Sequence, residues 1–172
     1  MELNYKVYGD EGDHLIILHG LLGSLDNWQT IARSLSAQFK VCVPDQRNHG
    51  RSPHSDAISY QLLSDDVFDF MQQHQIAKAH ILGHSMGGKV AMTFALQHPE
   101  KVEKLIVADI GPVAYQGDHL PLMDAMLSMP LSQLQERSEA EMHLAKTIHS
   151  SAIRQFLLKN LGRDQNGFFW KP

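Results

Sequence analysis

The five residues at positions 83–87, GHSMG, have the types and spacing that nucleophilic catalysis by a serine requires. They fit the pattern G-x-S-x-G, in which the serine stands on a sharp turn between a strand and a helix. An apolar run at 79–82 precedes the motif and an amphipathic segment follows it, so both flanking elements are predicted. Gly83 and Gly87 leave room for these elements to pack closely, and the helix N-terminus favours negative charge beside the serine. The motif therefore predicts Ser85 as the nucleophile of an acyl-transfer reaction.

An acyl-transfer serine also needs two hydrogen-bond donors aimed at the developing oxyanion, commonly backbone N–H groups. The residue after the nucleophile supplies one of them, which predicts the N–H of Met86 as a donor. The other is expected in the loop after an earlier strand, and the loop 19–23, HGLLG, follows the apolar run 14–18. Leu21 has the right place in that loop. His19 is interpreted as a ring that hydrogen-bonds the loop backbone, with a role as general base as the alternative.

Asp109 follows the apolar run 105–108, which is predicted to be a buried strand. A carboxylate in this position orients a catalytic histidine and stabilises its charged form, and capping of the following turn is the alternative. In this type of site the histidine comes after the serine and the acid in the chain. The histidines beyond Asp109 lie in no loop after a late strand, and we interpret them as surface or lid residues: His119, His143 and His149. We therefore predict that this chain holds no triad histidine.

Strands and helices are expected to alternate in the part of the chain that carries these residues. An edge strand is predicted at 3–7, and buried strands are predicted at 14–18, 40–43, 79–82 and 105–108. Helices are predicted at 28–35, at 58–73 and in a segment that ends at 96. This rhythm indicates an α/β fold, with a mostly parallel sheet and helices on both of its faces.

The character of the sequence changes after Pro112. Methionine is dense there, at positions 123, 126, 129 and 142, and no strand of the buried type is predicted between 119 and 161. Amphipathic helices are predicted at 131–135 and 152–158. We therefore predict two parts, a core at 1–115 and part of a helical lid, inserted over the sheet, at 116–172.

Composition limits the functions open to the chain. Its net charge of −4 over 172 residues argues against a broad basic surface for nucleic acid. No apolar run is long enough to span a membrane, and the first residues lack a signal-peptide pattern. The single cysteine, Cys42, is predicted to be a buried apolar residue and fits a reducing compartment, so a cytoplasmic location is expected. The polar loop 45–52, DQRNHGRS, is interpreted as pinned by side chains such as Arg47 and His49, with ligand binding as the alternative.

Four segments together resemble the YbfF-type esterases of the α/β-hydrolase superfamily: HGLLGSLDNW at 19–28, DQRNHGRS at 45–52, GHSMGGKVAM at 83–92 and ADIGPVAY at 108–115. The resemblance implies the α/β-hydrolase fold and the same four site residues, which are Ser85, Asp109, Leu21 and Met86. Members of that family are longer, and their remainder holds two further strands, helices and the catalytic histidine. The chain therefore resembles the N-terminal two thirds of such an enzyme, ending inside the lid.

The expected activity is that of a serine carboxylesterase that hydrolyses small to medium acyl esters through an acyl-enzyme on Ser85. Four further residues are expected to contact the substrate: His19, His84, Met123 and Met126. A thioesterase, a C–C hydrolase or lyase, and an impaired fragment or ligand-binding relative without the histidine are the alternatives. Neither a metal nor an organic cofactor is implied. A sheet without its final strands exposes an apolar edge, so self-association or pairing with the missing segment is also expected.

Overall fold

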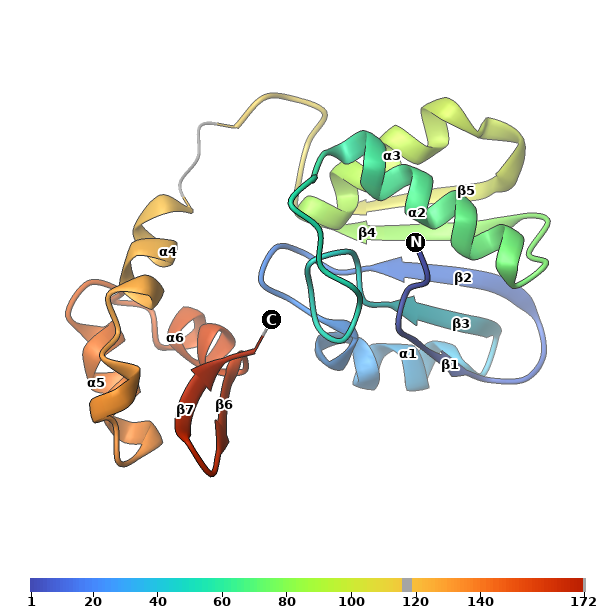
Figure 1. Ribbon diagram of the computed structural model, residues 1–172. Coiled ribbons are helices and arrows are strands. Elements are labelled where there is room, and N and C mark those ends of the chain that lie inside the picture. The colour runs from blue at the N-terminus through green and yellow to red at the C-terminus, as the bar shows by residue number, and fades with distance from the viewer. Residues whose placement is uncertain (116–118, 172) are drawn as a thin grey trace. The chain divides into compact units, whose positions relative to one another are not determined.

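The computed structural model describes residues 1–115 and 119–171 (Figure 1). By their internal contacts these residues divide into two compact units, Met1–Pro112 and Val113–Pro172.

A five-stranded sheet, in the order β1-β3-β2-β4-β5, is the centre of the first unit. Its strands are β1 (Tyr5–Tyr8), β2 (Asp13–Leu18), β3 (Phe39–Pro44), β4 (Ala79–His84) and β5 (Val102–Ala108). The edge strand β1 pairs with β3 in the antiparallel sense, and every other pair is parallel. The predicted α/β fold with a mostly parallel sheet is confirmed, and so is the edge position of the first strand.

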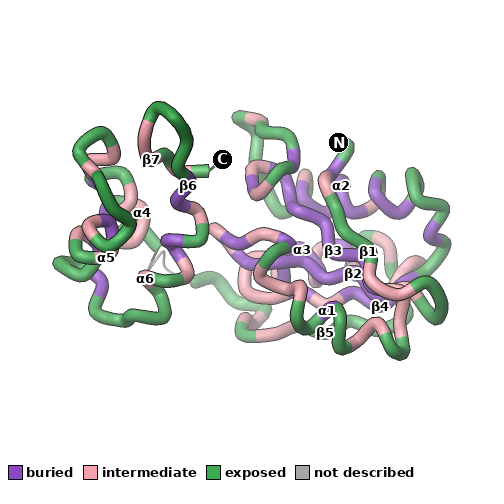
Figure 2. The backbone as a smooth tube through the Cα atoms, turned by 90° about the horizontal axis from the view of Figure 1, so that it is seen from below, coloured by how far each residue is buried: buried purple, intermediate pink, exposed green. Residues whose placement is uncertain are grey.

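Helices pack against both faces of this sheet, as predicted (Figure 1). The elements between the strands are η1 (Leu25–Trp28), α1 (Gln29–Leu35), α2 (Tyr60–Gln73), α3 (Met86–Gln97) and the short η2 (Pro99–Lys101). Side chains alternate along β2: Ile16 and Leu18 join the core under α2 and α3, whereas Leu15 and Ile17 join the core under η1 and α1. Figure 2 shows the resulting burial of β2, β3 and β4. A continuous apolar run is what a strand covered on both faces requires.

The prediction that the run 105–108 is a buried strand is wrong with respect to burial. The strand β5 forms, but Leu105 is 39% exposed and Ile106 is 44% exposed. The reason is position, because β5 is an edge strand that pairs with β4 and packs against α3. The core clusters lie over β2, β3 and β4 instead. The apolar edge expected from the sequence is therefore present.

The second unit consists of short helices followed by a hairpin. Its elements are α4 (Leu120–Leu127), η3 (Leu131–Gln133), α5 (Arg137–Ala145), α6 (Ser151–Leu158), β6 (Leu161–Asp164) and β7 (Gly167–Trp170). The predicted helix at 152–158 is confirmed. The predicted helix at 131–135 is wrong, because only a three-residue 3-10 turn forms before Leu134 adopts an extended conformation.

The hairpin was not predicted, and it is anchored by Trp170, whose Nε1 donates to the Met126 carbonyl at 2.9 Å. No helix in the described ranges is both long enough and apolar enough to cross a membrane.

The loop after β3 is held by the carboxylate of Asp45. That carboxylate accepts hydrogen bonds from the N–H of Leu25 at 2.7 Å, from the Asn4 amide at 2.7 Å and from the N–H of Arg51 at 3.0 Å. A side chain at Gly50 would overlap the same carboxylate. One buried acid therefore joins the start of the chain, the loop after β2 and the loop after β3.

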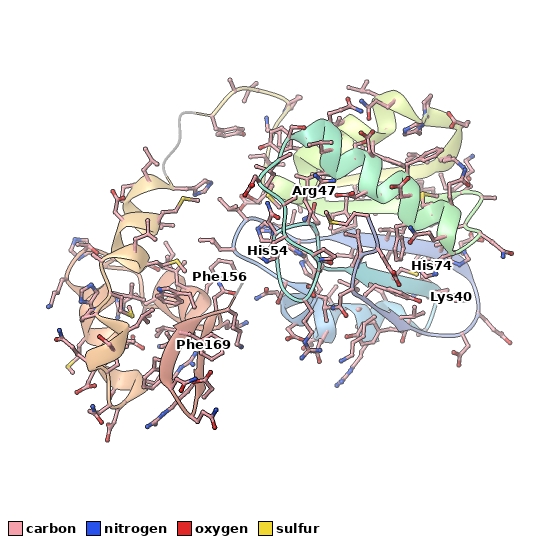
Figure 3. The ribbon with its side chains drawn as sticks, in the orientation of Figure 1. Lys40, Arg47, His54, His74, Phe156 and Phe169 are labelled. Atoms are coloured by element: carbon pink, nitrogen blue, oxygen red, sulfur yellow. The ribbon has the colours of Figure 1, made fainter. Side chains whose placement is uncertain are left out.

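A second buried interaction ties the same loop to α2. Arg47 donates from Nε and Nη2 to the two carboxylate oxygens of Asp66, at 2.5 and 2.9 Å, and both side chains are buried. Its remaining nitrogen donates to the Ala57 carbonyl at 3.0 Å. His49 Nδ1 hydrogen-bonds the Arg47 carbonyl at 2.9 Å. Figure 3 labels Arg47 and His54 on this loop. The interpretation that side chains pin the loop is confirmed.

We expect Asp45→Ala to lower the free energy of unfolding by about 3 kcal/mol, because three donors lose a charged acceptor at once. Urea denaturation followed by circular dichroism measures the change. Asp10→Ala is the control, since Asp10 is exposed and in the turn before β2. Equal midpoints for the two variants would contradict the central role of Asp45.

We also expect the 172-residue chain to self-associate through β5, because an exposed apolar edge strand can pair with another strand. Sedimentation equilibrium should show a mass that rises with concentration, and Ile106→Lys should reduce that rise. Leu96→Lys is the matched control, since Leu96 is 84% exposed on α3 and not on the edge. A monomer of 19.4 kDa at every concentration would rule this out.

Candidate active site

Ser85 lies between the last residue of β4 and the first residue of α3, on the predicted sharp turn. Its backbone angles are φ 53° and ψ −119°, in a region that residues with a side chain rarely adopt. The turn is held at both ends: the Ser85 N–H donates to the Ala108 carbonyl at 3.0 Å, and the Ser85 carbonyl accepts from Gly88 at 2.9 Å. The structure thus holds this serine in a strained conformation beside the end of β5.

Two glycines allow this turn, as the sequence predicts. A Cβ added to Gly83 would overlap the Gly87 carbonyl, and a Cβ added to Gly87 would overlap the Leu18 carbonyl at the end of β2. The backbones of β4, α3 and β2 therefore meet without intervening side chains. This close approach brings the loop after β2 to the serine.

The loop after β2 lies against Ser85. A Cβ built on Gly20 would be 3.2 Å from the Cβ of Ser85. The loop turns tightly, with the Gly23 N–H donating to the Gly20 carbonyl at 3.0 Å and Leu22 at φ 58°. Within the described residues, neither the N–H of Leu21 nor that of Met86 donates a hydrogen bond. Both groups are therefore available to an oxyanion, and their role as donors stays a prediction.

Asp109 stands directly after β5 with φ 57°, and its side chain is exposed. Its Oδ2 lies 3.7 Å from Nε2 of His84, and the Trp28 ring lies edge-on to His84 with ring centroids 6.2 Å apart. No pattern in the sequence predicted that His84 and Asp109 lie close together. Their proximity follows from the strand order. Strand β4 pairs with β5, and the pairing of His84 with Ala108 places Asp109 beside the turn at Ser85.

Residues with strained backbone angles are concentrated at the carboxyl ends of the parallel strands. Four residues with side chains and positive φ lie in the loops after the four parallel strands β2, β3, β4 and β5: Leu22, Asn48, Ser85 and Asp109. A fifth, Gln75, has an ordinary explanation as the left-handed residue that ends α2, where the Ile76 N–H donates to the Met71 carbonyl. Such conformations persist where the surrounding structure holds them, and they cluster at functional sites.

His19 is fully buried, and both of its ring nitrogens face backbone groups. Nδ1 lies 2.9 Å from the Gly20 carbonyl, and Nε2 accepts from the Gln46 N–H at 3.0 Å. Burial lowers the pKa of His19 to about 4. No ring nitrogen is left to hydrogen-bond a substrate or Ser85. The interpretation as a ring that hydrogen-bonds the loop backbone therefore describes this residue, and the roles expected for it as a general base or as a substrate contact do not.

The other predicted residues contribute less to this geometry. Met123 and Met126 lie on α4, and the three late histidines also belong to the second unit, so their roles stay predictions. Cys42 is buried, and desolvation raises its pKa to about 11, which agrees with an unreactive thiol. Within the residues that the structure describes, no cluster of His, Cys, Asp or Glu is suited to a metal ion.

Comparison with known proteins agrees with this geometry. The model of the alpha/beta hydrolase fold family matches residues 13–170. The sn-1-specific diacylglycerol lipase ABHD11 of Xenopus laevis is 41% identical over 99% of this chain and 58% of its own length. Esterase YbfF of Escherichia coli (strain K12) is 33% identical over 93% of this chain and 65% of its own length. A solved structure titled "Marine microorganism esterase" is 44% identical with a TM-score of 0.94, covering 98% of this chain and 67% of that one.

The match extends along almost the whole chain, although the chain spans only about three fifths to two thirds of the length of these two curated relatives. The resemblance to YbfF-type esterases is confirmed, and the strand order, the elbow at Ser85 and the family match agree with one another. The chain belongs to the alpha/beta hydrolase fold family.

Proposed function

We propose that this chain carries the nucleophile and the oxyanion donors of a carboxylic ester hydrolase. The hydroxyl of Ser85 attacks the ester carbonyl carbon, and its proton passes to a histidine. The alcohol leaves with that proton, and water then releases the acid from the acyl-enzyme.

The left-handed backbone of Ser85 is the observation that carries the proposal. A turn with φ 53° between a parallel strand and a helix lifts the serine side chain off the carboxyl edge of the sheet. Its neighbours suit the chemistry, because Leu21 and Met86 lie in the two backbone segments that meet at this serine, and within the described residues neither N–H donates a hydrogen bond. Backbone strain of this kind clusters at functional sites.

Asp109 is proposed as the acid that orients the histidine. It is exposed at the end of β5, next to the elbow, where an imidazole can reach both its carboxylate and Ser85. No hydrogen bond joins the Ser85 hydroxyl to a histidine in the described ranges. We therefore propose that the histidine comes from residues outside 1–172, in line with the greater length of the relatives.

The substrate class proposed is a carboxylic ester with a small to medium acyl chain. The ester class rests on the names of the relatives, a diacylglycerol lipase and an esterase, and the acyl length follows the expectation from the sequence. The cytoplasmic location stays a prediction.

We expect the chain to hydrolyse p-nitrophenyl butyrate slowly by itself and faster when imidazole is added, because free imidazole can replace the missing base. Imidazole cleaves this ester without protein, so the measurement is the difference between the parent chain and Ser85→Ala. That difference should rise with imidazole concentration. Ser132→Ala is the matched control, since Ser132 is exposed on η3. A parent chain that never exceeds Ser85→Ala would refute the proposal.

Asp109→Asn should lower the imidazole-dependent, Ser85-dependent rate about tenfold or more, because the amide cannot stabilise an imidazolium. Asp124→Asn serves as the control, since Asp124 is exposed on α4. If the two variants retain the same rate, Asp109 is not the acid and the capping interpretation of this residue stands.

A further inference from the structure

A reciprocal pair of hydrogen bonds joins the loop after β2 to the loop after β3. The His19 ring accepts the backbone N–H of Gln46 at 3.0 Å, and the Gln46 side chain donates to the backbone carbonyl of His19 at 2.5 Å. Both residues are buried, at 0% and 2% exposure. The two loops belong to neighbouring parallel strands, and this pair fixes their spacing.

The same ring also sets the orientation of one peptide group. Nδ1 of His19 donates to the Gly20 carbonyl at 2.9 Å, and the Gly23 N–H donates to that same carbonyl at 3.0 Å. The Gly20–Leu21 peptide is planar and trans, so its N–H points away from its carbonyl. Because that N–H belongs to Leu21, holding the Gly20 carbonyl fixes the direction of the proposed oxyanion donor.

Only the neutral ring with its proton on Nδ1 can make both contacts, because Nε2 must accept from Gln46. Burial, which lowers the pKa of His19 to about 4, keeps the ring neutral at ordinary pH. The ionisable groups that face it are the His49 ring, with centroids 5.2 Å apart, and the carboxylate of Asp45. The hydrogen-bond pattern therefore selects one tautomer.

We propose that His19, fixed by Gln46, is a positioning residue that aims the Leu21 N–H at the oxyanion formed on the Ser85 substrate. The role rests on the proposed function and adds to it a residue that touches neither the substrate nor Ser85. Gly20 lies against Ser85, with an added Cβ 3.2 Å from the serine Cβ, so a rotation of this peptide would move the donor within the site. A donor that is misaimed should reduce turnover without reducing substrate binding.

Two substitutions of His19 test the roles of its two ring nitrogens separately. In His19→Asn the amide N–H replaces Nδ1–H and can still donate to Gly20, whereas in His19→Gln the longer amide replaces Nε2 and can only accept from Gln46. We expect His19→Gln and His19→Ala to lower kcat about 10- to 100-fold in the imidazole-supported assay, with KM within about twofold of the parent. His19→Asn should recover most of the turnover that His19→Ala loses.

The amide of Leu21 gives a second readout that needs no catalysis. In ¹⁵N-resolved NMR spectra, its resonance should shift in His19→Gln and stay near the parent position in His19→Asn. This readout decides the positioning role even if the parent chain shows no Ser85-dependent hydrolysis, a result that would refute the esterase proposal alone. If turnover and the Leu21 resonance change equally in the Asn and Gln variants, or follow only their melting temperatures, His19 is a structural residue and the positioning role is overturned.

Discussion

The contact of backbone on backbone at the start of α3 is the constraint on which the rest of the site depends. Gly83 and Gly87 let β4, the first turn of α3 and the end of β2 approach until no side chain fits between them. At that separation the chain passes from strand to helix through the positive-φ conformation of Ser85. The packing of α3 into the core, through Val90, Ala91 and Phe94, stabilises what the turn alone would not.

Buried polar groups hold the loops around the serine. Asp45, the Arg47–Asp66 pair and the His19–Gln46 pair each connect segments distant in the sequence, and each is shielded from water. Buried polar groups are costly when unpaired, so an arrangement that pairs them favours a single loop geometry. Strained residues can then persist at the ends of four adjacent strands.

The sequence was most informative where a pattern reports a local requirement. The apolar runs located the strands, and the glycines around Ser85 identified the elbow, because both depend on neighbours within a few residues. The exposure of β5 was not predictable in this way, since the apolar run at 105–108 has the same sequence pattern whether or not other elements cover the strand. The proximity of His84 to Asp109 depends on strand order. The turn at 131–133 and the hairpin at 161–170 have short, weakly periodic sequences that carried no clear signal.

A buried neutral histidine also makes the fold sensitive to acid. The folded chain keeps His19 unprotonated down to about pH 4, whereas an unfolded chain takes up a proton near the ordinary pKa of 6.5. Between these values the unfolded state binds more protons, so acidification favours it by about 1.4 kcal/mol for each pH unit. The stability that this ring contributes is complete above pH 6.5 and is lost as the pH falls through 4. Protonation of the His19 ring, which hydrogen-bonds the loop beside Ser85, thus also favours unfolding of the chain.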